Sequence, residues 1–190
     1  NNVAVGALAL DANTTADSNT GVGYASLSDN TTGASNTALG RAALGGNTTA
    51  SNNTGIGFLA LGANTTGANN TAVGSNALDA NTTASNNTAI GYNALTSHTG
   101  TQCVAVGSEA LDANTTGNNN TAVGHGALTD QTTGSNATGI GFAAGYNNTT
   151  GTITALGSQA LYTNVTGNNN TALGLSALYN NTADNNTAVG

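Results

Sequence analysis

The sequence has no proline, methionine or tryptophan, and only one cysteine and one basic residue among its 190 residues. Arg41 is that basic residue, and eight acidic residues bring the net charge to −7. Nucleic acids and anionic membrane surfaces bind clusters of Lys and Arg, so we expect neither as a partner. The single cysteine, Cys103, excludes an internal disulfide framework. No apolar run is long enough to cross a bilayer, so we expect no membrane insertion.

Charged residues make up 5% of the chain and aromatic residues 4%, which is unlike an ordinary globular domain. Compositions this poor in charge and this rich in Asn, Thr and Gly also occur in disordered tracts. Here, however, the apolar residues, 37% of the chain, recur at fixed positions. Disorder gives no reason for such a pattern, so the sequence predicts an ordered repeat protein.

The chain reads as a single tandem repeat from residue 1 to residue 190. Successive units align on a glycine that follows Ala-Val, Ala-Leu or a related pair, and the consensus is N-T-A-V-G-x-x-A-L-x-x-N-T-T-G-x-N. Both ends fall at the same phase and neither shows an atypical capping unit, so we expect an excerpt of a longer array. The marker glycines are Gly6, Gly23, Gly40, Gly57, Gly74, Gly91, Gly107, Gly124, Gly141, Gly157, Gly174 and Gly190, spaced by seventeen residues or, in three units, sixteen.

A short fixed period with many Gly, Thr and Asn residues is unfavourable for helix and typical of a solenoid. Each unit has two short apolar runs, and the turn composition Asn-Thr-Thr-Gly follows the second. We therefore predict an all-β fold, a β-solenoid (parallel β-roll) of about eleven coils of 16–17 residues with two short strands per coil. At about 4.8 Å per coil, the rod would be on the order of 50 Å long.

Side-chain alternation places Thr71 and Val73 on one face of the first strand, and Ala72 and Gly74 on the other. We expect the larger aliphatic side chains to fill a thin core, and the Ala and Gly residues to form a smooth outer face. We also expect Asn to stack on Asn at the corners, as in other cross-β stacks. The predicted core columns are Ile56, Val73 and Ile90, and Leu61, Leu78 and Leu95.

The N-T-A-V-G-x-x-A-L segment resembles the head repeat of YadA-like trimeric autotransporter adhesins, and similar repeats of phage tail fibres and bacterial surface fibres. Residues 2–6 (N-V-A-V-G) and 103–107 (C-V-A-V-G) are most similar to it. The resemblance covers the whole chain. It implies a left-handed parallel β-roll, three chains side by side and a role in adhesion. The adhesin unit is usually shorter, and most units here have Thr where the adhesin has Val.

No motif indicates catalysis or a cofactor. The two histidines, His98 and His125, have no partner at metal-ligand spacing, and we interpret both as variable surface positions. Asp11, Asp79 and Asp112 share one repeat position but lie at least two coils apart, too far to act as a carboxylate pair. Phosphate-binding, nucleophile-elbow and calcium-repeat motifs are absent. We therefore expect a non-enzyme with no cofactor and no metal site.

Asn-x-Thr is also an acceptor sequence for N-glycosylation, and it recurs at two corners of the unit. Asn and Thr are also favourable turn and ladder residues, so a purely structural role at these corners remains open beside glycosylation. The candidate acceptors are Asn13, Asn30, Asn47, Asn64, Asn81 and Asn114 at one corner, and Asn52, Asn69, Asn86, Asn119, Asn169 and Asn185 at the other.

The position after the marker glycine is aromatic in several units, namely Tyr24, Phe58, Tyr92 and Phe142. We predict a row of exposed rings there, which would contact a ligand or pack at a subunit boundary.

Together these features predict a structural or adhesive segment of an extracellular fibre, on a cell or virion surface, that self-associates as a homotrimer. Its contact partner would be a host surface or a carbohydrate. Two alternatives remain. One is a single-chain surface filament coated with glycans. The other is a solenoid that binds carbohydrate or ice, and ice binding would need one flat, exposed Thr face.

Overall fold

The computed structural model describes all 190 residues, and its regular elements are twelve short strands. They form one parallel sheet in which each strand pairs with the strands before and after it in the sequence. The strands are β1 (Val3–Val5), β2 (Thr20–Val22), β3 (Thr37–Leu39), β4 (Thr54–Ile56), β5 (Thr71–Val73), β6 (Thr88–Ile90), β7 (Val104–Val106), β8 (Thr121–Val123), β9 (Thr138–Ile140), β10 (Ile153–Leu156), β11 (Asn170–Leu173) and β12 (Thr187–Val189).

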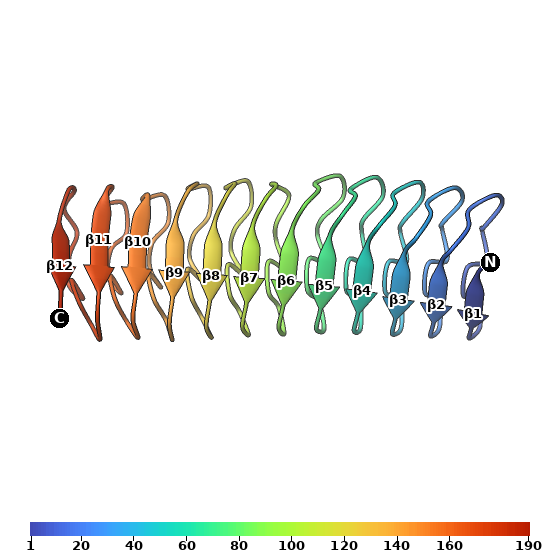
Figure 1. Ribbon diagram of the computed structural model, residues 1–190, viewed down its shortest axis with the longest axis horizontal. Helices are drawn as coiled ribbons and strands as arrows, with labels where there is room; N and C mark the ends of the chain where they lie inside the picture. Colours follow the sequence, from blue (N-terminus) through green and yellow to red (C-terminus); the bar gives the residue numbers. More distant parts are fainter.

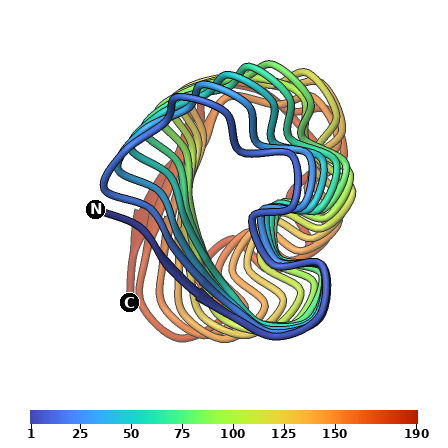
Figure 2. The same cartoon turned by 90° about the vertical axis from the view of Figure 1, so that its right-hand side faces the viewer.

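The chain winds into a straight rod in which every coil adds one strand to the sheet (Figure 1). Viewed along the rod, the coils lie almost on top of one another and turn gradually from one end to the other (Figure 2). The register repeats with the sequence, because Thr71 pairs with Thr88 and Val73 with Ile90. The predicted all-β solenoid of about eleven turns is therefore confirmed. The structure contains no helix, so none that could cross a membrane.

Each coil has one strand, and the prediction of two strands per coil was wrong. The second apolar run forms turns because its residues alternate in backbone handedness: Asn76 and Leu78 have φ of 57° and 53°. A left-handed residue at every other position cannot extend as a strand. Coil-to-coil bonding continues there nevertheless, since the Leu78 N–H donates to the Ala94 carbonyl at 3.1 Å. Only 24 of the 119 backbone hydrogen bonds lie within strands, so the turns and corners connect the coils as well.

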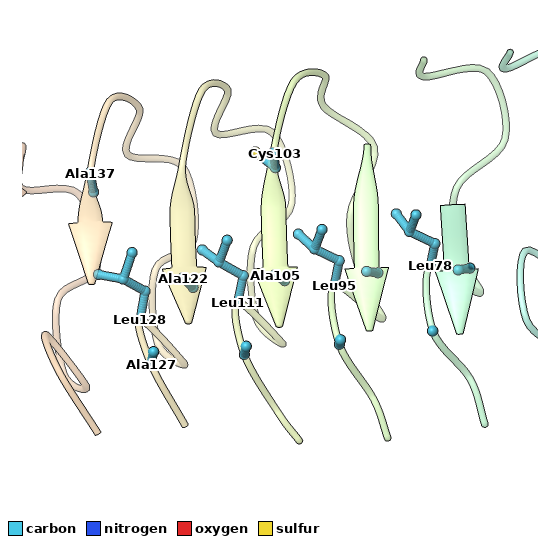
Figure 3. Close-up of a cluster of buried hydrophobic side chains, with 14 of the residues drawn as sticks. Leu78, Leu95, Cys103, Ala105, Leu111, Ala122, Ala127, Leu128 and Ala137 are labelled. Atoms are coloured by element: carbon cyan, nitrogen blue, oxygen red, sulfur yellow. The ribbon is translucent and has the colours of Figure 1, made fainter. Parts of the chain in front are cut away.

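The core is a column of leucines packed against a column of small residues from the centre of each strand (Figure 3). Leu61, Leu78 and Leu95 are fully buried, as expected. Ala72 and Ala89, at the strand centres, are fully buried too.

The second predicted column, Ile56, Val73 and Ile90, lies on the outside of the coil, and its assignment to the core was wrong. Ile90 is 39% exposed, whereas the neighbouring Ala89 is fully buried. The sheet thus faces the core with its Ala and Gly residues, and the smooth face expected outside lies inside.

Leucine from the turn side of the coil leaves no room for a larger residue at the strand centre. A Cβ added at Gly55 would lie 2.9 Å from the Ala60 carbonyl oxygen and 3.2 Å from Leu44 Cγ. Interiors packed this closely tolerate little extra volume. The side chains of the strand therefore alternate between its two faces as expected, but the small Ala and Gly residues are the ones that face the core.

Close stacking also explains the marker glycine. Gly57 has a φ of +134°, and a Cβ there would lie 2.5 Å from the Gly74 carbonyl oxygen in the next coil. No other residue both adopts this backbone conformation and allows that approach.

One coil replaces the core leucine by Gly145, and a residue from the same coil fills the space. Ile153 is 2% exposed at a column position where most coils have Asn. Its Cδ1 lies 2.7 Å from where a Gly145 Cβ would stand, so the isoleucine occupies the missing leucine's volume. The volume of the core is thus conserved even where its sequence is not.

Shortening Leu78 to Ala tests this core. We expect the free energy of unfolding to fall by about 2–5 kcal/mol, because a fully buried side chain leaves a cavity. The matched control is Leu175→Ala, because Leu175 is 73% exposed and its loss should cost less than about 0.5 kcal/mol. If urea unfolding shows that the two substitutions lower the free energy of unfolding equally, the placement of the leucine column in the core is contradicted.

Candidate functional site

The structure has no enclosed pocket and no group of three metal-ligating side chains. Its candidate functional features are therefore surfaces and repeated columns. Four are distinct: the outer face of the sheet, two buried ladders of asparagine, an exposed asparagine corner and a row of aromatic rings.

The outer sheet face consists of the two residues that flank the central Ala or Gly of each strand. The first is Thr in every strand except β1 and β7, which have Val3 and Val104. The second is Val, Ile or Leu throughout. The more exposed of these aliphatic residues in the central strands range from 37% at Ile140 to 48% at Leu39, whereas others, such as Val73, are only partly accessible. The result is two rows along the rod, an aliphatic row and a Thr row that is interrupted by Val at β1 and β7.

No charged residue lies in any strand, although the chain has nine. All eight acidic residues and Arg41 lie in the turns and corners. The net charge of −7 is therefore carried by the rest of the coil surface, and the outer sheet face is electrically neutral.

The first buried ladder, which we call the corner ladder, is formed by the Asn of each Asn-Thr-Thr corner. Asn64 Nδ2 donates to Asn47 Oδ1 in the preceding coil at 2.9 Å and to the Gly67 carbonyl at 3.0 Å. Asn81 Nδ2 repeats both bonds one coil later. The hydroxyl of the next residue forms a parallel column, as where Thr65 Oγ1 donates to the Thr82 carbonyl at 2.9 Å. Asn-Thr is thus the corner's bonding unit.

The second buried ladder, the strand ladder, is formed by the Asn that precedes the Thr of most strands. Asn70 Oδ1 accepts the N–H of Asn87 in the next coil at 2.9 Å, and Asn70 Nδ2 donates to the Ala84 carbonyl at 2.9 Å. The expected stacking of Asn on Asn is confirmed, but in the interior of the coil. Both Asn70 and Asn81 are fully buried.

The corner ladder corrects the first set of glycosylation candidates. Their side chains are turned into the coil, and all of their amide nitrogens except that of Asn114 donate a hydrogen bond there, so the folded coil offers little access for a glycan. Asn30, Asn47, Asn64, Asn81 and Asn114 are fully buried, and Asn13, in the terminal coil, is partly buried.

The second set lies on the exposed asparagine corner, where the chain turns into the strand. Asn52, Asn69, Asn86, Asn119, Asn169 and Asn185 are exposed and have φ between 56° and 64°. Asparagine tolerates this left-handed conformation better than most residues, which is enough to explain its presence there. Glycosylation of this corner stays a prediction.

The predicted aromatic row is exposed: Tyr24, Phe58, Tyr92 and Phe142 are 42–54% accessible. Phe142 stacks on His125 of the preceding coil with ring centroids 5.6 Å apart, and Arg41 lies 5.5 Å from the centroid of the Phe58 ring. The row follows the marker glycine and so borders the outer sheet face. Its role in contacts stays a prediction.

Sequence reasoning missed a second aromatic feature. Tyr146, Tyr162 and Tyr179 occupy one column directly after the core leucine position, and their rings stack with centroids 5.3 and 5.0 Å apart. Their spacing of sixteen and seventeen residues was the available signal. Because each ring covers the face of its neighbour, this column stabilises the last coils.

His98 and Cys103 are buried, and the interpretation of His98 as a surface position was wrong. His98 occupies the corner ladder and Cys103 the strand ladder, because both lie in a sixteen-residue unit at positions that are Asn in most other units. Burial raises the pKa of the Cys103 thiol to about 11, so it stays protonated and unreactive. His125 is exposed, as expected.

Asp79 and Asp112 lie in one turn column and are partly buried, which raises the pKa of each carboxyl above its ordinary value. Two coils separate them, and Thr96 holds the same position in the coil between. They therefore form no carboxylate pair.

Comparison of the chain with protein-family models, with curated proteins and with solved structures gives no match. Function is therefore inferred from the geometry of the coil and from the repeat sequence.

Replacing one corner-ladder residue tests the contribution of the ladder to stability. Asn64→Ala removes two donated bonds and the acceptor of Asn81 Nδ2. Since each buried polar group left unpaired costs about 1–3 kcal/mol, we expect a loss of at least about 2 kcal/mol in urea unfolding.

The control is Asn69→Gly on the exposed asparagine corner, where φ is 59° and glycine fits the backbone. It should change the free energy of unfolding by less than about 0.5 kcal/mol. A loss at Asn69 as large as the loss at Asn64 would show that the buried ladder is not a special source of stability.

Proposed function

We propose that this protein is a non-catalytic structural segment of an extracellular fibre, in which copies of the chain pack through their outer sheet faces into a homotrimer. The observation that carries the proposal is the unbroken, charge-free outer sheet face along a rod of twelve strands. Adhesion to a host surface or carbohydrate would then fall to the remaining surfaces of the coil.

The shape of the molecule supports a mechanical role. Each coil bonds only to the coils before and after it, so the rod lengthens without any change in its cross-section. At about 4.8 Å per strand, twelve strands extend on the order of 50 Å. Such a construction supplies length and stiffness, which are the properties a fibre needs.

The charge distribution supports a second copy of the chain as the occupant of the outer sheet face. Two molecules of net charge −7 repel each other unless their charged surfaces are kept apart. Contact through the neutral sheet faces does this, because every charged side chain lies in the turns and corners. The partly exposed row of Val, Ile and Leu would be removed from water in the same contact.

The number of copies is taken from the repeat sequence. The N-T-A-V-G-x-x-A-L segment resembles the repeat of trimeric adhesins, and the two residues flanking the strand's central Ala form the outer sheet face here. Three such faces can meet around an axis parallel to the rod, which gives a closed assembly with no edge left for further growth.

Ice binding is the second candidate, and the outward position of the Thr row favours it. Thr71, Thr88 and most of their equivalents form one column along the parallel sheet, at the coil spacing of about 4.8 Å. Only a chain that leaves this face uncovered could use it for ice, so the two candidates differ in oligomeric state.

The native mass of the protein tests the proposal. We expect a native mass three times the denatured mass. A bare monomer would overturn the trimer, and slowed growth of ice crystals in its presence would support the second candidate. A monomer with a large, heterogeneous excess over the sequence mass of 18.2 kDa would indicate a glycan-coated filament instead.

Ile90→Lys tests the face itself. The substitution places one charge on the outer sheet face, where Ile90 is 39% exposed, and burying it in the assembly without a partner is unfavourable. We expect a folded monomer in native mass spectrometry. The control, Thr83→Lys, adds the same charge at an exposed corner residue outside the sheet and should remain trimeric. If Ile90→Lys also remains trimeric, the copies do not meet through this face.

A further inference from the structure

The corner ladder is interrupted at two places, one on each side of the contacting pair His98 and Asn114. Four buried side-chain atoms in the whole chain lack a hydrogen-bond partner: Asn81 Oδ1, His98 Nε2, Asn114 Nδ2 and Gln131 Nε2. These atoms belong to four successive members of the corner ladder. Buried polar groups are normally paired, so four unpaired atoms in one row share a cause.

Elsewhere the corner ladder has one direction: each side-chain nitrogen donates to the oxygen of the preceding coil. Asn47 Nδ2 donates to Asn30 Oδ1 at 2.8 Å, and Asn164 Nδ2 to Asn148 Oδ1 at 3.0 Å. Asn148 Nδ2 likewise donates to Gln131 Oε1. The direction is thus the same on both sides of His98.

Asn114 is turned the other way. Its Oδ1 lies 2.6 Å from His98 Nδ1, so it faces the preceding coil with an acceptor rather than a donor. At Asn64 the oxygen lies beside Gly67, 2.6 Å from where a Cβ would stand, whereas at Asn114 the nitrogen holds that place beside Gly117, at 2.7 Å. This arrangement suits an imidazole protonated on Nδ1. It leaves Asn114 Nδ2 and Gln131 Nε2, two donors, without acceptors.

We propose that at neutral pH His98 is an uncharged link of the corner ladder, with its proton on Nε2, donating to Asn81 Oδ1 and accepting at Nδ1 from Asn114 Nδ2. Inverting the Asn114 amide then returns its oxygen to the usual place, where it accepts from Gln131 Nε2. One tautomer and one amide inversion satisfy all four atoms and restore a single direction along the ladder.

Acid reverses this arrangement. A proton added to Nδ1 turns that atom from an acceptor into a donor, so Asn114 must invert to present its oxygen, and the ladder breaks between Asn114 and Gln131. The imidazole is buried against Asn114 and the Gly100 backbone, and no charged side chain contacts it to offset the new charge. The coil that contains His98 is therefore an acid-sensitive point in a rod with few other groups that titrate near neutral pH.

The charged groups of the adjoining coils lie outside this enclosure. Asp79 and Asp112 precede the ladder positions by two residues and are partly exposed, and the Cys103 thiol of the same coil stays protonated. Burial lowers the pKa of His98 below its ordinary value of 6.5. The folded state thus binds fewer protons than the unfolded state below pH 6.5, and stability falls as the pH drops through that value.

The tautomer can be observed directly by nitrogen-15 NMR of the histidine rings. The chain has two histidines, so His125→Asn leaves His98 as the only imidazole. We expect a protonated Nε2 and an unprotonated Nδ1 at pH 7.5, and conversion to the doubly protonated ring only below pH 6.5. A ring protonated on Nδ1 at pH 7.5 would overturn the proposal.

The mechanical consequence is tested by the pH dependence of unfolding. Between pH 6.5 and the lowered pKa of His98, each decrease of one pH unit should raise the unfolding equilibrium constant of the parent chain by up to tenfold. His98→Asn restores the ladder consensus and should remove that dependence, whereas His125→Asn should retain it. If His98→Asn and the parent chain respond equally to acid, His98 is not the acid-sensitive link, whatever the oligomeric state proves to be.

Discussion

Hydrogen bonds between buried side-chain amides of successive coils are the interaction on which this structure depends. Most coils have one fully buried leucine and a few alanines, such as Leu78, Ala72 and Ala77, and this apolar core is thin. Asparagines such as Asn64 and Asn70 occupy the rest of the interior, where a hydrophobic side chain would otherwise be expected. Such residues are tolerated where their amides are paired, as Asn64 is within its own coil and to the coils on either side. The repeat period follows from this pairing, since one coil must present the same amides at the same place as the next.

A narrow interior also determines which residues face outward. Leucine from the turn side fills the space opposite the strand, so the strand centre must be Ala or Gly, and the larger Thr and Val, Ile or Leu of the same strand point to solvent. The packing of the inside thus produces a neutral, partly apolar outer face as a by-product. This link joins the coil's internal structure to the proposed self-association.

The sequence was sufficient to predict the solenoid, its period, the leucine column and the stacking of asparagine, because each follows from a spacing that repeats through the chain. It did not determine which of the two faces of the strand is turned toward the core. Alternation separates Thr71 and Val73 from Ala72, but the direction depends on how much space Leu78 leaves, which only the three-dimensional coil shows. The assumption that larger aliphatic residues lie inside failed for this reason.

The same difficulty affected the polar residues. Asn-Thr-Thr reads as a solvent-exposed turn, and burial of Asn64 or His98 is unfavourable unless every amide has a partner. Those partners come from adjacent coils and from the Gly67 carbonyl, so they are specified by stacking rather than by local sequence. The turn conformation of Leu78 had no local signal either, because leucine seldom adopts a positive φ.

Hydrogen exchange of the asparagine side-chain amides tests the central claim most directly. The account predicts that the Nδ2 protons of Asn47 and Asn64 exchange as slowly as backbone amides of the central strands, while those of Asn69 and Asn86, on the exposed asparagine corner, exchange at the rate of free asparagine. Equally fast exchange at all four residues would mean that the interior amides are open to water, and it would contradict the account.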